Sequence, residues 1–211
     1  MAKNVILIGG GGHCKSVIDV AESAGYHILG ILDKPEEVGR QVLDYKVIGV
    51  DDDIPLYVDK AEFIITVGFI KNSALRIKLY HKVLEARGRL ATLVASTAYV
   101  SKYAVLGKGT VVMHNAFVNA GAVVGDNAII NTFSNIEHDV RIGNQCHIST
   151  GTMVNGDCSV GNNVFVGSQS VLSNGINICD DVIVGAGSFV RKSINVKGIY
   201  SGNPTILKIR L

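Results

Sequence analysis

The segment Ala122–Ile148, AVVGDNAIINTFSNIEHDVRIGNQCHI, repeats one pattern every six residues: a small or β-branched residue, any residue, then an aliphatic residue. The same aliphatic position recurs without a break from Val100 to Val196. Its seventeen members are Val100, Leu106, Val112, Val118, Val124, Ile130, Ile136, Ile142, Ile148, Val154, Val160, Val166, Leu172, Ile178, Val184, Val190 and Val196. A period of six fits neither an amphipathic helix nor a single alternating strand, and it is typical of a parallel β-helix built from hexapeptides.

Three hexads predict one triangular coil of 18 residues, with coils stacked about 4.8 Å apart. The aliphatic residues would fill the interior of the prism, and the small residues would let the chain turn inward at each corner. Glycine often follows the aliphatic residue, as at Gly107, Gly125 and Gly143. We therefore expect an all-β parallel β-helix domain over residues 96–211, including a C-terminal tail.

Residues 1–95 have a different pattern, in which short apolar runs alternate with helical periodicity. Such alternation indicates βαβ units and a parallel sheet, so we predict a Rossmann-like α/β domain. The expected strands cover 4–8, 27–33, 63–68 and 90–94, the expected helices cover 14–24 and 72–86, and 39–53 is expected to be loop and edge strand. The boundary between the domains should fall near Ser96.

The composition is that of a compact protein with an ample core. Hydrophobic residues make up 47% of the 211 residues, and the formal net charge is +2 with no run of Lys or Arg, which argues against nucleic acid as a partner. No apolar segment approaches the length of a signal peptide or a membrane span. The four cysteines show no paired or metal-ligand spacing, so we interpret them as reduced packing residues in a cytoplasmic protein.

Four glycines, Gly9–Gly12, separate the first predicted strand from the first helix. Such a turn lets backbone N–H groups and a helix N-terminus face a phosphate, and Asp33 ends the next strand where a ribose-binding acid would lie. Cys14 replaces the last glycine of a dinucleotide motif, and the domain is too short for two mononucleotide-binding halves. We therefore favour a nucleotide or nucleotide sugar over NAD, with a tight turn that needs positive φ as the alternative.

The whole chain resembles the sugar O- and N-acyltransferases of surface-glycan pathways. These include bacillosamine-pathway UDP-4-amino-sugar N-acetyltransferases, perosamine N-acetyltransferases and sialic acid O-acetyltransferases. The resemblance rests on the Gly-Gly-His opening, on the stretch from Asn131 to Val140 and on the ending Gly202-Asn203-Pro204. It implies a left-handed β-helix, acetyl-CoA as acyl donor and a homotrimer with clefts between neighbouring β-helices. The chain departs from the family at Cys14-Lys15 and at Thr205-Ile206.

Acyl transfer from a thioester needs a base for the attacking nucleophile and donors for the oxyanion. His138 follows the core residue Ile136 by two places, so it should project outward near a corner, flanked by Glu137 and Asp139. Gly156 lies 18 residues later and should stack directly above His138. We predict His138 as the general base, Asp139 or Glu137 as the residue that orients it, and the Gly156 N–H as an oxyanion donor. A solvated histidine on a polar turn is the alternative.

The resemblance also suggests roles for two further histidines and for the later coils. It implies that His147 contacts the acyl donor and that His13 contacts the substrate or a water. The alternatives are a structural hydrogen-bonding role for His147 and a helix N-terminal residue without a ligand for His13. The predicted acetyl-CoA residues are His147, Gly156, Gly167, Ser168, Gly185, Ala186, Gly187, Arg191 and Lys192, the last two facing the CoA phosphates. The predicted substrate residues are Gly9, Gly10, Gly11, Gly12, His13, Asp33 and Gly68. The alternative interpretation of the later glycines is tight β-helix corners, and that of Arg191 and Lys192 is surface charge.

Three classes of function are weighed against these residues: an acyltransferase, a zinc enzyme and a non-catalytic scaffold. We expect an acetyl-CoA-dependent N-acetyltransferase that acts on a nucleotide-linked 4-amino-6-deoxy sugar, or alternatively an O-acetyltransferase that acts on sialic acid or a related sugar. A zinc enzyme would need three converging histidines, but the intervals of 24 and nine residues from His114 to His138 to His147 are not multiples of 18, so no metal is expected. A non-catalytic sugar-nucleotide-binding scaffold is the third possibility.

Overall fold

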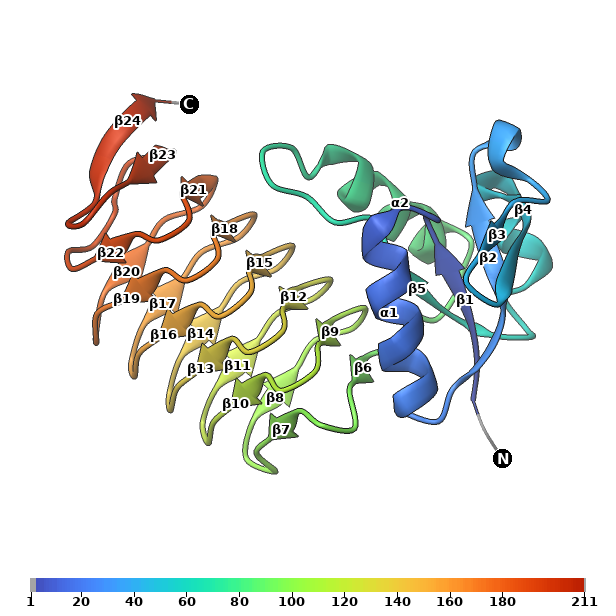
Figure 1. Ribbon diagram of the computed structural model, residues 1–211, viewed down its shortest axis with the longest axis horizontal. Helices are drawn as coiled ribbons and strands as arrows, with labels where there is room; N and C mark the ends of the chain where they lie inside the picture. Colours follow the sequence, from blue (N-terminus) through green and yellow to red (C-terminus); the bar gives the residue numbers. More distant parts are fainter. Residues whose placement is uncertain (1–2, 211) are drawn as a thin grey trace.

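The computed structural model describes residues 3–210, which form an α/β domain packed against one face of a triangular β-helix (Figure 1). The α/β domain has a five-stranded sheet in the order β3-β4-β2-β1-β5, parallel except at the antiparallel edge strand β3. Its elements are β1 (Asn4–Ile8), α1 (Gly12–Ser23), β2 (His27–Asp33), η1 (Pro35–Glu37), β3 (Gln41–Val42), β4 (Tyr45–Val50), η2 (Asp51–Leu56), β5 (Glu62–Ile65) and α2 (Ala74–Glu85).

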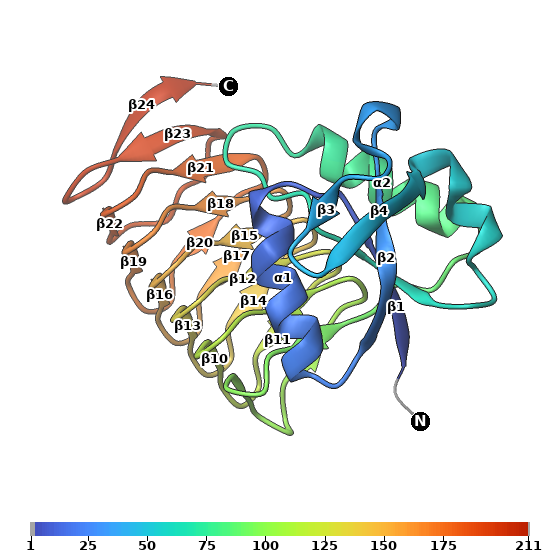
Figure 2. The same cartoon turned by 45° about the vertical axis from the view of Figure 1, so that its right-hand side comes forward.

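The two helices cover opposite faces of this sheet because β1 is apolar on both faces. Val5 and Leu7 pack in the cluster of α1, whereas Ile6 and Ile8 pack in the cluster of α2. Helix α1 also contacts the β-helix, since Val111 belongs to its cluster, and Figure 2 shows α1 between the sheet and the coils. The α/β domain is therefore fixed directly on the β-helix.

The β-helix has three faces, which we name after the strands of one coil. The β13 face contains β7 (Tyr99–Val100), β10 (Phe117–Val118), β13 (Asn135–Ile136), β16 (Met153–Val154), β19 (Val171–Leu172) and β22 (Phe189–Val190). The β14 face contains β8 (Val105–Leu106), β11 (Val123–Val124), β14 (Arg141–Ile142), β17 (Ser159–Val160) and β20 (Asn177–Ile178). The β15 face, which carries the α/β domain, contains β6 (Leu93–Val94), β9 (Val111–Val112), β12 (Ile129–Ile130), β15 (His147–Ile148), β18 (Phe165–Val166), β21 (Val182–Val184), β23 (Gly198–Ser201) and the antiparallel β24 (Ile206–Arg210).

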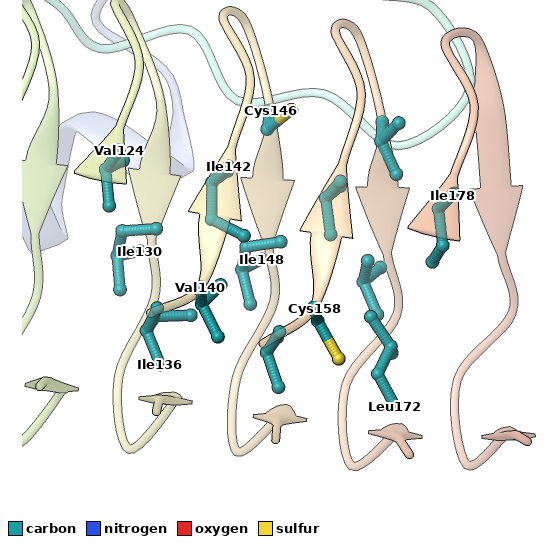
Figure 3. Close-up of a cluster of buried hydrophobic side chains, with 14 of the residues drawn as sticks. Val124, Ile130, Ile136, Val140, Ile142, Cys146, Ile148, Cys158, Leu172 and Ile178 are labelled. Carbon is teal, nitrogen blue, oxygen red and sulfur yellow. The ribbon is translucent and has the colours of Figure 1, made fainter. Parts of the chain in front are cut away.

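The coil length is the predicted 18 residues through most of the domain. Phe117 pairs with Asn135, Asn135 with Met153, and Met153 with Val171. The aliphatic residues of successive hexads form one continuous core, in which the small positions such as Cys146 and Cys158 are also buried (Figure 3). The structure confirms the predicted parallel β-helix of hexapeptide repeats.

One corner of the prism is stabilised by a ladder of side chains. Asp126, Asn144, Asn162 and Asp180 each accept a hydrogen bond, through Oδ1, from the backbone N–H found 18 residues earlier, at distances of 2.7–2.9 Å. A glycine precedes each member except Asp180, and the close approach of the coils requires it, because a Cβ on Gly143 would lie 2.6 Å from the Gly161 carbonyl oxygen. The glycines that follow the aliphatic residues thus have a packing role.

The two ends of the repeat differ from the prediction. Val196 is 38% exposed and lies in no strand, because the last coil has 16 residues and places Ile194, not Val196, beside Ile178. At the other end, only Leu93–Val94 of the predicted strand 90–94 forms a strand, and it pairs with β9 of the β-helix. Leu90 makes a single bridge to Phe63 in the α/β sheet.

All four cysteines are free thiols, and three of them are buried. Within residues 3–210, neither helix has the length and apolar character needed to cross a membrane.

Candidate active site

The glycine turn forms the floor of a cavity of about 630 Å³ between the α/β domain and the β-helix. Every residue predicted to bind the substrate lines this cavity: Gly9, Gly10, Gly11, Gly12, His13, Asp33 and Gly68. Gly11 caps α1 without a side-chain hydrogen bond, and a Cβ at Gly11 or Gly12 would meet nothing within 4 Å. An open helix N-terminus thus faces the cavity, as an anion site requires.

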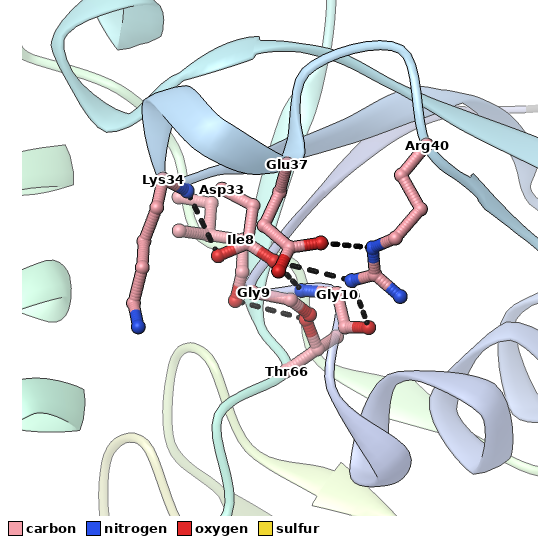
Figure 4. Close-up of polar contacts among 8 residues, drawn as sticks. All are labelled: Ile8, Gly9, Gly10, Asp33, Lys34, Glu37, Arg40 and Thr66. Carbon is pink, nitrogen blue, oxygen red and sulfur yellow. Dashed lines mark hydrogen bonds and ion pairs between the residues drawn. The ribbon is translucent and has the colours of Figure 1, made fainter.

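Asp33 is held by the turn itself (Figure 4). The Gly10 N–H donates to Asp33 Oδ2 at 2.8 Å, and the Lys34 N–H donates to Oδ1 at 2.9 Å. Arg40 Nη2 lies 3.6 Å from the same Oδ2 and donates to the Gly10 carbonyl at 2.9 Å. The Gly10 N–H is therefore already paired. An anionic ligand would be bound by the N–H groups at the start of α1 together with Lys34 and Arg40.

His147 lies on β15 where the two domains meet, and only 8% of its surface is exposed. Its Nδ1 donates to the Phe69 carbonyl at 2.8 Å, because a carbonyl can only accept, and its Nε2 accepts from the Asn131 amide at 3.2 Å. Burial lowers the pKa of His147 to about 4. The ring is thus neutral near pH 7, in a tautomer set by its neighbours.

His13 lies close to His147, with 6.4 Å between the ring centroids. Its Nε2 is buried and has no hydrogen-bond partner among residues 3–210. Burial, followed by the charge of Arg76 and the proximity of His147, lowers the pKa of His13 to about 3. An unpaired buried nitrogen is costly, so this atom is suited to a ligand in the cavity.

A second cavity of about 390 Å³ adjoins the first on the outer side of the β15 face. Five residues predicted to bind acetyl-CoA line it: His147, Gly167, Ser168, Gly185 and Ala186. The rest of its wall comes from Ile70, Lys71, Ser149, Phe165, Ile183 and Ile199. Four predicted residues are not part of it. Gly156 lies against His138, Gly187 lies at the turn after Ala186, and Arg191 and Lys192 border a separate small cavity with Pro204 and Thr205.

His138 and Gly156 lie together, as the 18-residue spacing predicts. A Cβ on Gly156 would lie 2.6 Å from His138 Nε2, so the imidazole directly covers this glycine. The Gly156 N–H makes no hydrogen bond to another residue of the described chain. His138 Nδ1 donates to Asp139 Oδ2 at 2.9 Å, which leaves Nε2 as the nitrogen that can take a proton.

Asp139, and not Glu137, is the carboxylate that contacts His138. Its hydrogen bond raises the pKa of His138, whose side chain is 59% exposed. Glu137 accepts hydrogen bonds from Asn135 at 3.0 Å and from Asn119 at 2.8 Å, and these lower its pKa. Through these hydrogen bonds, Glu137 stabilises the turn that contains His138.

Within one chain, His138 is separated from both cavities. It lies in the turn between β13 and β14, at the corner opposite the β15 face that bears the cavities (Figures 1 and 2). His114 lies at a third corner, beside Thr97 and Asp19. No group of three His, Cys, Asp or Glu residues within 3–210 could hold a metal ion.

Known proteins match both domains. Residues 4–83 match the PglD N-terminal domain, and residues 121–156 and 157–192 match the bacterial transferase hexapeptide of six repeats. The structure of PerB from Caulobacter crescentus, in complex with CoA and GDP-perosamine, is 31% identical with a TM-score of 0.90, and the match covers 99% of this chain and 98% of that one. The chain belongs to the sugar acyltransferase family.

Two further similar proteins match different shares of this chain. The acetyltransferase domain of PglB from Neisseria gonorrhoeae, in complex with acetyl coenzyme A, is 26% identical with a TM-score of 0.90 over 99% of this chain and 100% of that domain. An uncharacterized protein of Acanthamoeba polyphaga mimivirus is 34% identical over 108 residues, 51% of this chain. The chain spans only 21% of the length of that curated relative.

Several residues of the acyltransferase site were not singled out from the sequence. Asn131 stands in the motif that carries the family resemblance, so its spacing before His147 offered a signal. Arg40 lies in the segment 39–53 expected to be loop and edge strand, and Lys34 follows the expected strand that ends at Asp33. Phe69 and Ile70 follow a strand without any repeat to place them. These residues approach the site through the packing of the two domains, which local sequence patterns do not describe.

Proposed function

We propose that this chain transfers the acetyl group of acetyl-CoA to the amine of a nucleotide-linked 4-amino-6-deoxy sugar. The observation that carries the proposal is the junction of the two cavities at His147: a cavity with charged wall residues and an open helix N-terminus adjoins an apolar one on the β-helix. A nucleotide diphosphate suits the first, and a pantetheine arm suits the second. The relatives whose structures contain CoA with GDP-perosamine, or acetyl-CoA, support the same assignment.

The substrate nucleotide would lie over Gly11 and Gly12, with its diphosphate on the N-terminus of α1 and near Lys34 and Arg40. Its sugar would extend toward His13 and His147, both of which stay neutral and so bind without repelling a cationic amine. This arrangement favours a nucleotide-linked amino sugar over free sialic acid. A cytoplasmic location is part of the proposal, supported by the four free thiols.

The base would come from a neighbouring copy of the chain, in a homotrimer. The outward side chains of the β13 face form a row that is apolar except at Asn135: Tyr99, Phe117, Asn135, Met153, Val171 and Phe189. Tyr99 is 56% exposed and stacks on Phe117, although it belongs to no core. If this face is turned toward a threefold axis, the His138 corner of each copy meets the Ser149–Ser168 corner of the next, beside its second cavity.

In the proposed reaction, the amine nitrogen attacks the thioester carbonyl carbon, and the C–N bond forms as the C–S bond breaks. His138 Nε2 takes the proton from the amine nitrogen and passes it to the departing thiolate. Asp139 stabilises the imidazolium, and the Gly156 N–H donates to the oxyanion.

The experiment measures thiol release from acetyl-CoA with GDP- and UDP-linked 4-amino-6-deoxy sugars, with the matching 4-hydroxy sugars, and with free sialic acid. The proposal predicts release with an amino sugar nucleotide and mass-spectrometric detection of its N-acetyl product. Release with sialic acid alone, or with none of the acceptors, would contradict it.

A further inference from the structure

The two cavities share only two wall residues among those described, His147 and Ile70. His147 is fixed by hydrogen bonds on both ring nitrogens. Ile70 makes no such bond, and its side chain is 60% exposed. An apolar side chain with this exposure, placed between two cavities, can determine what passes from one to the other.

The backbone around Ile70 is fixed on both sides by contacts between the domains. The Phe69 carbonyl accepts from His147, and the Ser73 hydroxyl donates to Asn163 Oδ1 at 2.5 Å. Arg76 donates through Nη1 to the carbonyls of Ile65 and Val67, at 2.7 and 2.9 Å. The segment that carries Ile70 is therefore anchored to both domains.

Arg76 strengthens this attachment. Its guanidinium is fully buried and bonded to carbonyl oxygens, including that of Asn127 at the corner of the β-helix. These bonds fix the loop that carries Ile70 against the coils.

On the basis of the proposed function, we propose that Ile70 determines the length of the acyl chain that the enzyme accepts. With the pantetheine arm in the apolar cavity, the thioester carbon reaches the junction beside His147, where the amine arrives from the other side. The acyl tail then points at Ile70. A methyl group fits beside the isoleucine, whereas each additional methylene meets its side chain.

The test compares acetyl-, propionyl- and butyryl-CoA with one amino sugar nucleotide as acceptor. In Ile70→Ala, the ratio of kcat/KM for propionyl-CoA to kcat/KM for acetyl-CoA should rise by about tenfold or more, the range for one methylene in an apolar site. Ile70→Val should give an intermediate rise, and Ile70→Phe should lower the ratio. Calorimetry of the same three thioesters, without acceptor, should show the same order of affinity.

Two controls isolate the effect. Leu75→Ala removes an exposed leucine that lines the first cavity alone, so it should leave the acyl ratio unchanged. Leu84→Ala, on the exposed side of α2, should leave both rate and ratio unchanged.

A ratio that changes by less than about twofold in Ile70→Ala would overturn the role of Ile70. Failure of the wild-type protein to acetylate any amino sugar nucleotide would instead overturn the proposed function. In that case the calorimetric order of the thioesters still decides whether Ile70 selects acyl length.

Discussion

His138 and His147 are nine residues apart, half of one 18-residue coil, and therefore lie on opposite sides of the prism. His138 is exposed beside a carboxylate, which raises its pKa, whereas His147 is buried beside a carbonyl, and burial lowers its pKa to about 4. The imidazole of His138 is thus suited to accept a proton, whereas the imidazole of His147, on the opposite face, remains neutral. The comparison indicates that environment, not residue type, separates a base from a hydrogen-bonding wall residue.

The largest expected effect is the loss of the base. His138→Ala should lower kcat by about 10²–10⁴-fold, the usual contribution of general-base catalysis. KM for acetyl-CoA should change little, since proton transfer to the base occurs only in the transition state and does not contribute to binding of the thioester. Steady-state thiol release measures both constants. Retention of more than about a tenth of wild-type kcat would show that His138 is not the base.

Gly156→Ala should have the next largest effect. The added Cβ would lie 2.6 Å from His138 Nε2, so the ring must move away from its position above the glycine. A displacement of about 1 Å in a reacting group can reduce the rate by 10²-fold. Circular dichroism should show an intact fold, because alanine is compatible with this backbone. An unchanged kcat would show that the stacking of His138 on Gly156 is unimportant.

Asp139→Asn should lower kcat less than His138→Ala does, and it should change the pH dependence of kcat/KM. Asp139 raises the pKa of His138, so loss of its charge lowers that pKa and keeps Nε2 unprotonated to lower pH. The acidic limb of the kcat/KM profile should therefore move to lower pH. Glu137→Gln serves as the matched control and should move the limb less than Asp139→Asn, because Glu137 raises the pKa of His138 only through its charge and makes no hydrogen bond to the ring.

These residues show what the sequence could predict. A strict repeat converts spacing directly into position, so the core, the 18-residue coil and the stacking of Gly156 on His138 all followed from counting residues. Counting fails where the repeat ends: the last coil is two residues shorter, which exposes Val196. Arg191 and Lys192, predicted near the CoA phosphates, follow β22 as Glu137 and His138 follow β13, so they lie at the His138 corner and apart from the second cavity of their own chain.

The rest of the site could not be predicted because it depends on contacts between the domains. The Phe69 carbonyl that fixes His147 comes from 78 residues earlier in the chain. That contact leaves no local pattern in the sequence. The choice of Asp139 over Glu137 is different, because Asn119 and Asn135, which bind the glutamate, lie in the β-helix, and Asn119 stands one coil of 18 residues before Glu137.

The smallest expected effect concerns stability. The pKa of His147 is lowered on folding, so the unfolded chain binds a proton that the folded chain does not, and stability is lost as pH falls from about 6.5 toward about 4. The slope for one histidine is at most about 1.4 kcal/mol per pH unit. His147→Gln should reduce the pH dependence of the free energy of unfolding in this window, measured by urea titration. His81→Gln, exposed on α2, is the control, and equal slopes in both variants would contradict the account.

The central claim is that the base and the cavities of one site belong to different copies of the chain. Two variants test it: His138→Ala removes the base, and Gly11→Trp fills the first cavity at a position where the backbone is extended and a Cβ meets nothing within 4 Å. Each alone should be nearly inactive. Co-expressed in equal amounts, they should recover activity at about a quarter of the sites, because one in four neighbouring pairs combines an intact His138 with an intact cavity. Mixed assemblies that stay as inactive as the single variants would contradict the claim and place the whole site within one chain.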